Sequence, residues 1–219
     1  MSARPLTPED VRERLDVSRE TVAKLEIYLS ALQRWNRSIN LVAPTTLKDP
    51  WRRHILDCGQ LAALIPEDAQ TIADMGSGAG LPGMILAMMN PKKHLVLIES
   101  DGRKCAFLRL MAAELSPNAE VIHERLKSLE RRADIVTARA LAPLSALLDY
   151  AEPLKTARTR GLFLKGRGAK EELTEAGEYW NMHVETRPSL SDASGQILII
   201  ANFRRRLPSE RQGQCASFR

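Results

Sequence analysis

Residues 74–83 read Asp-Met-Gly-Ser-Gly-Ala-Gly-Leu-Pro-Gly and overlap the end of a short apolar run, Thr71–Met75. Alternating glycines let a backbone turn sharply and approach a ligand closely, because no Cβ is in the way. A short apolar run that ends in such a turn is typical of a buried strand that leads into a helix. Ligands of parallel sheets bind beyond the carboxyl ends of the strands. The segment therefore predicts both a first strand and a ligand site.

After Pro66, further short apolar runs alternate with segments of helical period. The runs are Leu95–Ile98, Val121–His123, Ile135–Ala138, Gly161–Leu164 and Ile197–Ala201. Between them apolar residues recur at spacings of three and four, as in residues 107–115. Strands that alternate with helices predict right-handed crossovers and a largely parallel sheet with both faces buried. We therefore expect a doubly wound α/β domain.

The first 66 residues have a helical pattern instead. Thr7 and Ser18 each precede a segment of helical period and predict two helix starts. A third helix is expected from Asp49 to about Ile65. The expected organisation is a helical N-terminal segment, 1–66, packed on the core, an α/β domain, 67–206, and a flexible basic tail, 207–219.

Composition and charge narrow the class of protein. The chain has 219 residues, of which 44% are hydrophobic and 27% charged, as in ordinary globular proteins. Residues 203–219 hold five Arg against one Glu, a surplus of +4, so only +1 of the net charge of +5 lies elsewhere. The longest uncharged stretch, 75–91, is broken by glycine and proline, and the chain start lacks the apolar core of a secretion signal. We expect no membrane span, a cytoplasmic location and a monomer.

Several ligands compete for the glycine turn. Gly78, Gly80 and Gly83 satisfy the dinucleotide fingerprint G-x-G-x-x-G. A P-loop is excluded because Met and Ile stand at 84–85, where Lys and Ser or Thr are required. Asp74 disfavours a dinucleotide, since its carboxylate would meet the negative pyrophosphate. S-adenosylmethionine carries a sulfonium and an ammonium group, which suit an acid beside the glycines.

A second acid supports a nucleoside ligand. Glu99 follows the apolar run that ends at Ile98, and it lies 19 residues after Gly80. At this place a carboxylate can accept both ribose hydroxyls. Asp74 and Glu99, in register with two consecutive strands, therefore favour S-adenosylmethionine. An NAD-linked oxidoreductase remains the alternative on the glycine fingerprint alone.

The motifs around the turn form a recognisable combination. Upstream stand Trp35-Asn36, Asn40-Leu41 and Arg53-His54-Ile55-Leu56-Asp57. Downstream stand Glu99-Ser100-x-x-Arg103-Lys104-x-x-Phe107-Leu108, Thr137-Ala138-Arg139-Ala140 and Leu164-Lys165-Gly166. Over roughly residues 20–202 this combination resembles the small-subunit ribosomal RNA methyltransferase G family, also called GidB or RsmG. The resemblance implies a class I S-adenosylmethionine-dependent methyltransferase with a Rossmann-like sheet, which methylates N7 of a guanine in 16S rRNA.

The resemblance also implies site residues. By position, Gly76 and Leu81 would contact the methionine and nucleoside parts of the cofactor, and Arg139 would lie at its edge facing the substrate. Leu126 and Lys127 would line the adenine pocket through their backbone, although the family often carries an acid at the position of Lys127. The full set of expected cofactor contacts is Asp74, Gly76, Gly78, Gly80, Leu81, Glu99, Leu126, Lys127 and Arg139.

The expected chemistry needs few catalytic groups. Guanine N7 has an in-plane lone pair and no proton, so its methylation requires neither a general base nor a covalent intermediate. No catalytic residue is assigned with certainty, and the positioning candidates are Arg139 and Lys165. Arg139 would hold the cofactor carboxylate or an RNA phosphate. Three widely spaced cysteines without a CxxC pair predict no metal site.

The expected partner is 16S rRNA or the small ribosomal subunit, with the target base extruded from its stack. The RNA-contact candidates are Arg53, His54, Lys165 and Arg167. Other readings stay open, because Arg53 could pair with Asp57 four residues on, and His54 could simply pack. A non-catalytic RNA-binding module is the second alternative function. Sequence alone leaves open which guanine is methylated and whether naked RNA or an assembled subunit is the substrate.

Overall fold

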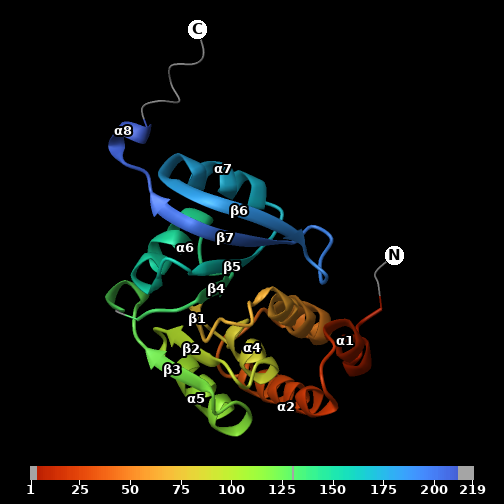
Figure 1. The fold of residues 1–219 in the computed structure, drawn as a ribbon. Helices are drawn as coiled ribbons and strands as arrows, with labels where there is room; N and C mark the ends of the chain where they lie inside the picture. The colour runs from red at the N-terminus through yellow and green to blue at the C-terminus, as the bar shows by residue number, and fades with distance from the viewer. Residues whose placement is uncertain (1–3, 130, 212–219) are drawn as a thin grey trace.

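A computed structural model describes residues 4–129 and 131–211, and a seven-stranded sheet forms its centre (Figure 1). The strand order is β3-β2-β1-β4-β5-β7-β6. The strands are β1 (Thr71–Met75), β2 (His94–Glu99), β3 (Ala119–His123), β4 (Ile135–Arg139), β5 (Arg160–Lys165), β6 (Trp180–Pro188) and β7 (Gln196–Arg205). Strands β1 to β5 are parallel, whereas β7 runs antiparallel to both β5 and β6. The predicted doubly wound α/β sheet is confirmed, with an antiparallel hairpin added at one edge.

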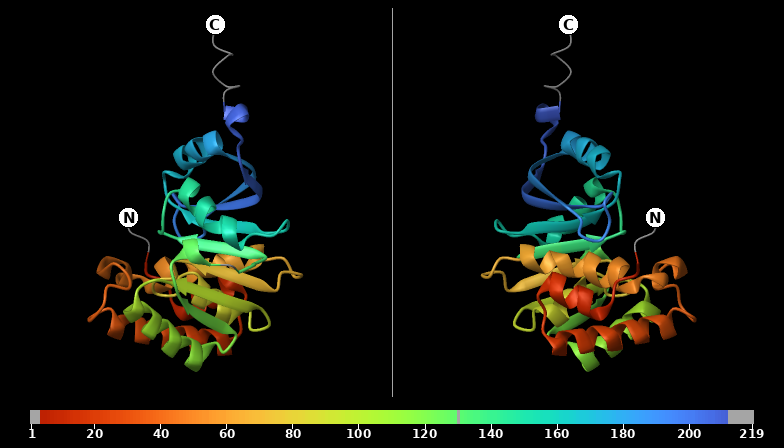
Figure 2. Two further views of the ribbon diagram at one scale, coloured as in Figure 1. Left: turned by 90° about the vertical axis from the view of Figure 1, so that its left-hand side faces the viewer. Right: turned by 90° about the vertical axis from the view of Figure 1, so that its right-hand side faces the viewer.

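Helices cover both faces of the sheet (Figure 2). They are α4 (Gly83–Met89), α5 (Gly102–Leu115), α6 (Leu144–Ala151), α7 (Ala169–Tyr179) and α8 (Pro208–Arg211), with short 3₁₀ turns η4 (Leu126–Ser128) and η5 (Glu152–Leu154). Successive strand residues point to opposite faces, so Ile72 packs in the cluster with α4 and α5, while Ala73 packs in the cluster with α6 and α7. Two hydrophobic layers therefore fix the sheet. None of the helices in the described ranges is long and apolar enough to cross a membrane.

The N-terminal segment is helical, as predicted. It contains α1 (Pro8–Leu15), α2 (Arg19–Trp35), η1 (Pro44–Lys48), η2 (Trp51–Leu56), α3 (Asp57–Gly59) and η3 (Gln60–Leu64). The side chains of Thr7 and Ser18 cap α1 and α2 by accepting backbone N–H bonds, which confirms both predicted starts. The third predicted helix is irregular: η2 is a π-helix, α3 a single α turn and η3 a 3₁₀ helix. Wide π turns of this kind are frequent at functional sites.

The helical segment contacts the glycine turn directly. The buried Tyr28 of α2 donates its hydroxyl proton to the carbonyl of Ala79 at 2.7 Å. Its ring and that of Trp35 lie 6.1 and 5.6 Å from the ring of Phe107 on α5. The N-terminal segment thus packs on the same sheet face as α4 and α5 and holds the glycine turn through the bond from Tyr28 to Ala79.

Strand β6 is the main element that the sequence analysis missed. Its residues read Trp-Asn-Met-His-Val-Glu-Thr-Arg-Pro, and most of them are partly or fully exposed. An edge strand faces water on one side, so its polar residues hide the apolar alternation that marks a buried strand. β6 and β7 form a hairpin whose loop, residues 189–195, reaches the N-terminal segment. Of the predicted tail, residues 208–211 form α8, and residues 212–219 lie outside the described ranges.

Candidate active site

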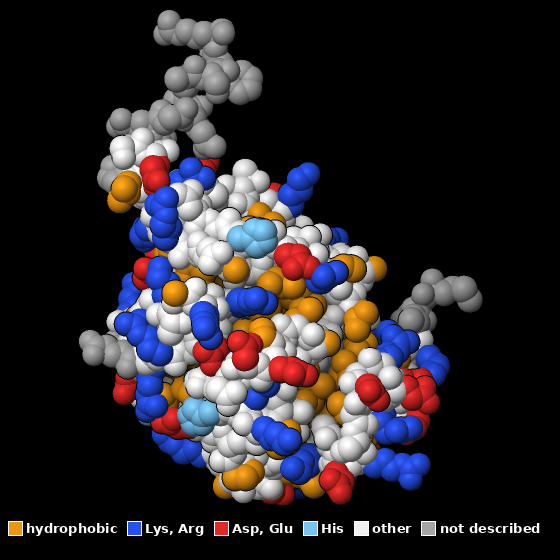
Figure 3. All heavy atoms as spheres, in the orientation of Figure 1, with side chains coloured by type: hydrophobic (Ala, Val, Ile, Leu, Met, Phe, Trp, Pro, Cys, Tyr) orange, Lys and Arg blue, Asp and Glu red, His pale blue; other side chains and the backbone are white. Residues whose placement is uncertain are grey.

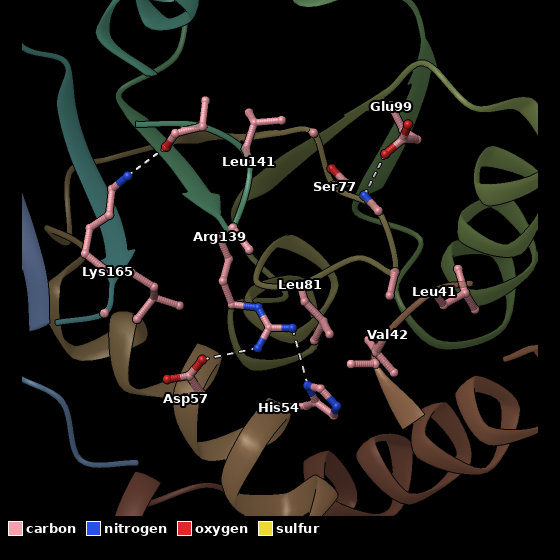
Figure 4. Close-up of a pocket in the computed structure, with 18 of the residues that line it drawn as sticks. Leu41, Val42, His54, Asp57, Ser77, Leu81, Glu99, Arg139, Leu141 and Lys165 are labelled. Carbon is pink, nitrogen blue, oxygen red and sulfur yellow. Dashed lines mark hydrogen bonds and ion pairs between the residues drawn. The ribbon is translucent and has the colours of Figure 1, made fainter. Parts of the chain in front are cut away.

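A cavity of about 1290 Å³ lies at the carboxyl ends of the parallel strands (Figure 4). Its walls come from the glycine turn, the segments that follow β2, β3, β4 and β5, the N-terminal segment and the β6–β7 loop. Pockets for a single small ligand usually have about 300–1,000 Å³. The cavity therefore has room for a nucleoside cofactor together with part of a second molecule.

The glycine turn borders the cavity through Gly76, Ser77, Gly78, Ala79 and Leu81. Gly76, Gly78 and Gly80 have φ angles of +64°, +57° and +85°, which glycine adopts without strain. A Cβ on Gly78 would find no atom closer than 3.9 Å, so this residue faces open space in the cavity. A Cβ on Gly80 would lie 2.7 Å from the side chain of Met84. Gly80 does not line the cavity, so the expectation that it contacts the cofactor is corrected. Because it has no side chain, Gly80 instead lets the turn pack closely on α4.

Glu99 holds the turn from the cavity side. The residue is only 8% exposed. Its Oε2 accepts the backbone N–H of Gly78 at 2.8 Å. Oε1 accepts the N–H groups of Ser100 and Asp101, each at 2.8 Å. A carboxylate can accept about four hydrogen bonds, so Oε2 keeps one position for a ligand. Glu99 lines the cavity, as the sequence pattern suggested.

Asp74 holds the end of the turn, where it leads into α4. It is fully buried, and its Oδ2 accepts the N–H of Gly83 at 3.1 Å. The expectation that its carboxylate faces a cationic ligand is wrong, because Asp74 shares a strand face with Ile72 and points toward α4 rather than into the cavity. Oδ1 has no hydrogen-bond partner in the described part of the chain. Burial raises the pKa of Asp74 to about 7, although the bonds from Ser77 and Gly83 oppose the shift.

The segment after β3 supplies the next part of the wall. Leu126 and Lys127 of η4 line the cavity, and Lys127 is exposed. Because the side chain of Lys127 is exposed to water, a contact with adenine would come from its backbone. Glu124 and Arg125 also line the cavity and were not predicted. Their place directly after a strand end was the available signal.

Arg139, at the end of β4, makes three hydrogen bonds with the N-terminal segment, and Figure 4 marks those to Asp57 and His54. Its Nη1 donates to the carbonyl of Arg53 at 3.0 Å and to Oδ2 of Asp57 at 3.2 Å. Its Nη2 donates to Nδ1 of His54 at 3.3 Å. The possible pairing of Arg53 with Asp57 is therefore wrong: Asp57 pairs with Arg139, and Arg53 pairs with Asp192 at 3.4 Å.

The residues predicted to contact RNA differ in how exposed they are. Arg53 borders the cavity and is half exposed, and Arg167 is exposed but outside the cavity lining. His54 is 1% exposed, so it cannot meet RNA in this conformation, and the prediction of an RNA contact is corrected. Burial, together with Arg139 and Arg53, lowers the pKa of His54 to about 3. His54 is neutral at ordinary pH.

The predicted RNA contact of Lys165 is also corrected. Its side chain is 9% exposed, and its Nζ donates to Oε2 of Glu172 and to the carbonyl of Ala142, both at 2.7 Å. The same Glu172 oxygen accepts the N–H of Leu144 at 2.7 Å. The charge of Lys165 is thus neutralised within the protein, where it ties the β4–α6 loop to α7. Lys165 lines the cavity, but its ammonium group is paired and is not a free phosphate contact.

The β6–β7 loop is the part of the site that sequence reasoning missed. Ser191 donates its hydroxyl proton to Oδ1 of Asp57 at 2.6 Å, and the N–H of Leu190 donates to the side chain of Gln60 at 2.7 Å. Ser189 and Asp192 line the cavity as well. Serines in a turn give no sign of such a role until the hairpin is known. Within the described ranges, no three His, Cys, Asp or Glu side chains gather as they would around a metal ion.

The raised pKa of Asp74 predicts a pH-dependent stability. Its folded pKa, about 7, lies above the ordinary value, so the folded state binds this proton more tightly than the unfolded state. Asp74 thus lowers the free energy of unfolding as the pH rises from about 4 to about 7, by at most about 1.4 kcal/mol per pH unit. Urea denaturation across this range should show a smaller fall for Asp74→Asn than for the unchanged protein. Equal pH slopes for the two proteins would contradict the raised pKa.

Comparison with known proteins agrees with this geometry. Residues 21–198 match the family model described as rRNA small subunit methyltransferase G. A ribosomal RNA small subunit methyltransferase G from Rhodospirillum rubrum is 49% identical over 203 residues, 91% of this chain and 100% of that one. The protein of the same name from Paramagnetospirillum magneticum is 46% identical over 200 residues, 90% of this chain and 97% of that one.

Solved structures support the fold. The magnesium protoporphyrin IX methyltransferase of Synechocystis PCC 6803, solved with bound S-adenosylmethionine, has a TM-score of 0.57 and 14% identity. The match covers 85% of this chain and 98% of that one. At this identity the likeness concerns the fold, a Rossmann-like class I methyltransferase sheet. By its matches in sequence, the chain belongs to the rRNA small subunit methyltransferase G family.

Proposed function

We propose that this protein transfers the methyl group of S-adenosylmethionine to N7 of a guanine in 16S rRNA. The observation that carries the proposal is that the glycine turn, Glu99 and Arg139 border one large cavity in a chain of this family. The names of the relatives support small-subunit rRNA as the substrate. Such a substrate implies that the protein works in the cytoplasm.

The cavity has groups suited to each part of the cofactor. Glu99 keeps one acceptor position for a ribose hydroxyl, and Gly78 leaves open space beside it. The backbone of Leu126 and Lys127 would hold the adenine, while Gly76 and Leu81 would contact the rest of the molecule. These residues fit S-adenosylmethionine better than a dinucleotide, because the N–H of Gly78, which a pyrophosphate would need, already donates to the negative carboxylate of Glu99.

Arg139 is suited to the carboxylate of the cofactor. The parallel register pairs Asp74 with Thr137, so Gly76 and Arg139 are each two residues beyond the same pair. Arg139 therefore lies at the same end of the sheet as the glycine turn, and both border the cavity. A guanidinium has five N–H groups, and the three bonds to the described N-terminal segment leave the Nε proton and one Nη2 proton. Two N–H groups in a plane match a carboxylate.

The proposed chemistry requires no general base from the site. Bound S-adenosylmethionine supplies an electrophilic methyl group, and guanine N7 needs no deprotonation before attack. What the protein must do is hold the base in line with the methyl group, which contributes up to about 7–11 kcal/mol in the best intramolecular models. The partly buried and paired side chains of Arg139 and Lys165 are suited to holding rather than to proton transfer.

A nucleoside assay tests the proposal. The protein is incubated with methyl-labelled S-adenosylmethionine and undermethylated small-subunit RNA, and the digested RNA is examined by mass spectrometry. We expect labelled 7-methylguanosine, and we expect S-adenosylhomocysteine but not NAD to bind in calorimetry. Binding of NAD alone would favour an oxidoreductase. Cofactor binding without 7-methylguanosine at stoichiometric protein would favour a non-catalytic RNA-binding module.

Gly78→Val tests the place of the cofactor. A Val side chain here enters the open cavity, and its positive φ costs about 1–2 kcal/mol, so the protein should stay folded. We expect affinity for S-adenosylhomocysteine to fall at least about ten-fold, equivalent to 1.4 kcal/mol. The matched control is Gly168→Val, at φ −79° in open space outside the cavity lining, which should leave affinity unchanged. Equal affinities for a folded Gly78→Val and the control would refute this placement.

Basic side chains differ in their availability to RNA. Figure 3 shows many of them along the left edge of the face it draws, between α8 and the loop after β3. In the α8 region, however, Arg204 pairs with Glu210 and Arg205 with Asp149. Lys104 and Lys127 border the cavity, and no acidic partner contacts their ammonium groups within the part of the chain described. They are therefore the cations at the cavity that are best placed to meet RNA phosphates.

Salt dependence measures these contacts. In Lys104→Ala or Lys127→Ala, the slope of log affinity for RNA against log salt should become shallower by about 0.7–0.9 for each lost phosphate contact. Affinity for S-adenosylhomocysteine should not change, because neither ammonium group is required for the proposed cofactor contacts. Lys92→Ala is the control, since this exposed residue precedes β2 at the opposite end of the strands. If the cavity variants match the control, RNA binds elsewhere.

A further inference from the structure

The Arg139 guanidinium is held on two sides by side chains of the N-terminal segment. Asp57 contributes a carboxylate oxygen 3.2 Å from Nη1, and His54 contributes Nδ1 at 3.3 Å from Nη2 (Figure 4). The backbone carbonyl of Arg53 adds a third acceptor at 3.0 Å. All three acceptors come from one short stretch of η2 and α3. This fixes both the position and the plane of the guanidinium.

The hydrogen bonds around His54 agree with an acceptor role. The hydroxyl of Thr46 donates to the carbonyl of Ala43 at 2.7 Å, so its oxygen is free to accept from Nε2 of His54 at 2.9 Å. With the proton on Nε2, Nδ1 carries a lone pair and can accept from Arg139. A protonated His54 would instead present a donor to a guanidinium, and burial beside Arg139 and Arg53 keeps its pKa low.

Asp57 is oriented in turn by the β6–β7 loop. Ser191 donates to Oδ1 at 2.6 Å, which leaves Oδ2 for Arg139. Gln60 links the same two segments, since its Oε1 accepts the N–H of Leu190 and its Nε2 donates to the hydroxyl of Ser189. The hairpin loop thus reaches Arg139 through one carboxylate.

We propose that His54 and Asp57, with Ser191 behind Asp57, are positioning residues that direct the two remaining N–H groups of Arg139 toward the carboxylate of the cofactor. The identity of that cofactor rests on the proposed function. In this arrangement His54 and Asp57 would touch neither the methyl group nor the RNA. They act only through Arg139.

Two ligands separate positioning from general support of the fold. S-adenosylhomocysteine carries the amino-acid carboxylate, whereas 5′-methylthioadenosine has the same nucleoside without it. In Arg139→Ala and Asp57→Ala, calorimetry should show at least about ten-fold weaker binding of S-adenosylhomocysteine, as expected for loss of a hydrogen bond to a charged group. Binding of 5′-methylthioadenosine should change less than about two-fold. Equal losses for both ligands would overturn the inference, since they would indicate damage to the whole site.

Milder variants keep the test informative if Asp57→Ala does not fold. Ser191→Ala should weaken S-adenosylhomocysteine selectively, by about two- to five-fold, because one neutral hydrogen bond is lost. His54→Asn retains an acceptor near the place of Nδ1 and should bind more tightly than His54→Ala. If both His54 variants and Ser191→Ala bind like the unchanged protein, the inference is wrong.

A double variant gives an independent outcome. If Asp57 acts through Arg139, then Asp57→Ala should cause no further loss of affinity for S-adenosylhomocysteine in an Arg139→Ala background. Additive losses would overturn the inference and leave the proposed function intact. Failure of the unchanged protein to bind either nucleoside would overturn the proposed function, and this inference with it.

Discussion

Two carboxylates hold the backbone of the glycine turn at two different points, and the rest of the site depends on this. Asp74 accepts the N–H of Gly83 where the turn enters α4, and Glu99 accepts the N–H of Gly78 where it borders the cavity. The Tyr28 hydroxyl adds a third contact at the Ala79 carbonyl. A chain of glycines has many accessible conformations. The turn can present a defined wall to a ligand because buried groups select one of them.

The cavity is closed by segments that are distant in sequence. The N-terminal segment and the β6–β7 loop meet at Asp57, which binds Ser191 with one oxygen and Arg139 with the other. The pairing of β1 with β4 in turn places Arg139 at the same end of the sheet as the glycine turn. Both hydrogen-bonded links are partly buried, where such contacts are stronger than in water. The helical segment and the edge hairpin thereby become part of the site, although neither belongs to the parallel sheet.

Much of the fold could be predicted from local pattern. The run Thr71–Met75 matches β1, and the predicted runs for β2 and β4 end within one residue of the observed strands. Buried parallel strands are apolar throughout, so they are conspicuous in sequence. The edge strand β6 was missed because one side of it faces water. The cap residues Thr7 and Ser18 were correctly placed, since capping depends on neighbours within three residues.

By itself, the sequence determined the parallel sheet and the glycine turn at its first strand. The motifs around that turn also indicated the protein family. These features depend on residue type and short spacing. Tertiary structure alone decided which side chains face the ligand. Asp74 and Glu99 point to the same face of the sheet, but Asp74 lies level with Leu97, two residues before Glu99, so α4 covers Asp74 whereas Glu99 reaches the cavity. It also decided that Lys165 is neutralised by Glu172 and that Asp57 pairs with Arg139, 82 residues away. Such pairings depend on distances in space, which the spacing of residues along the chain does not contain.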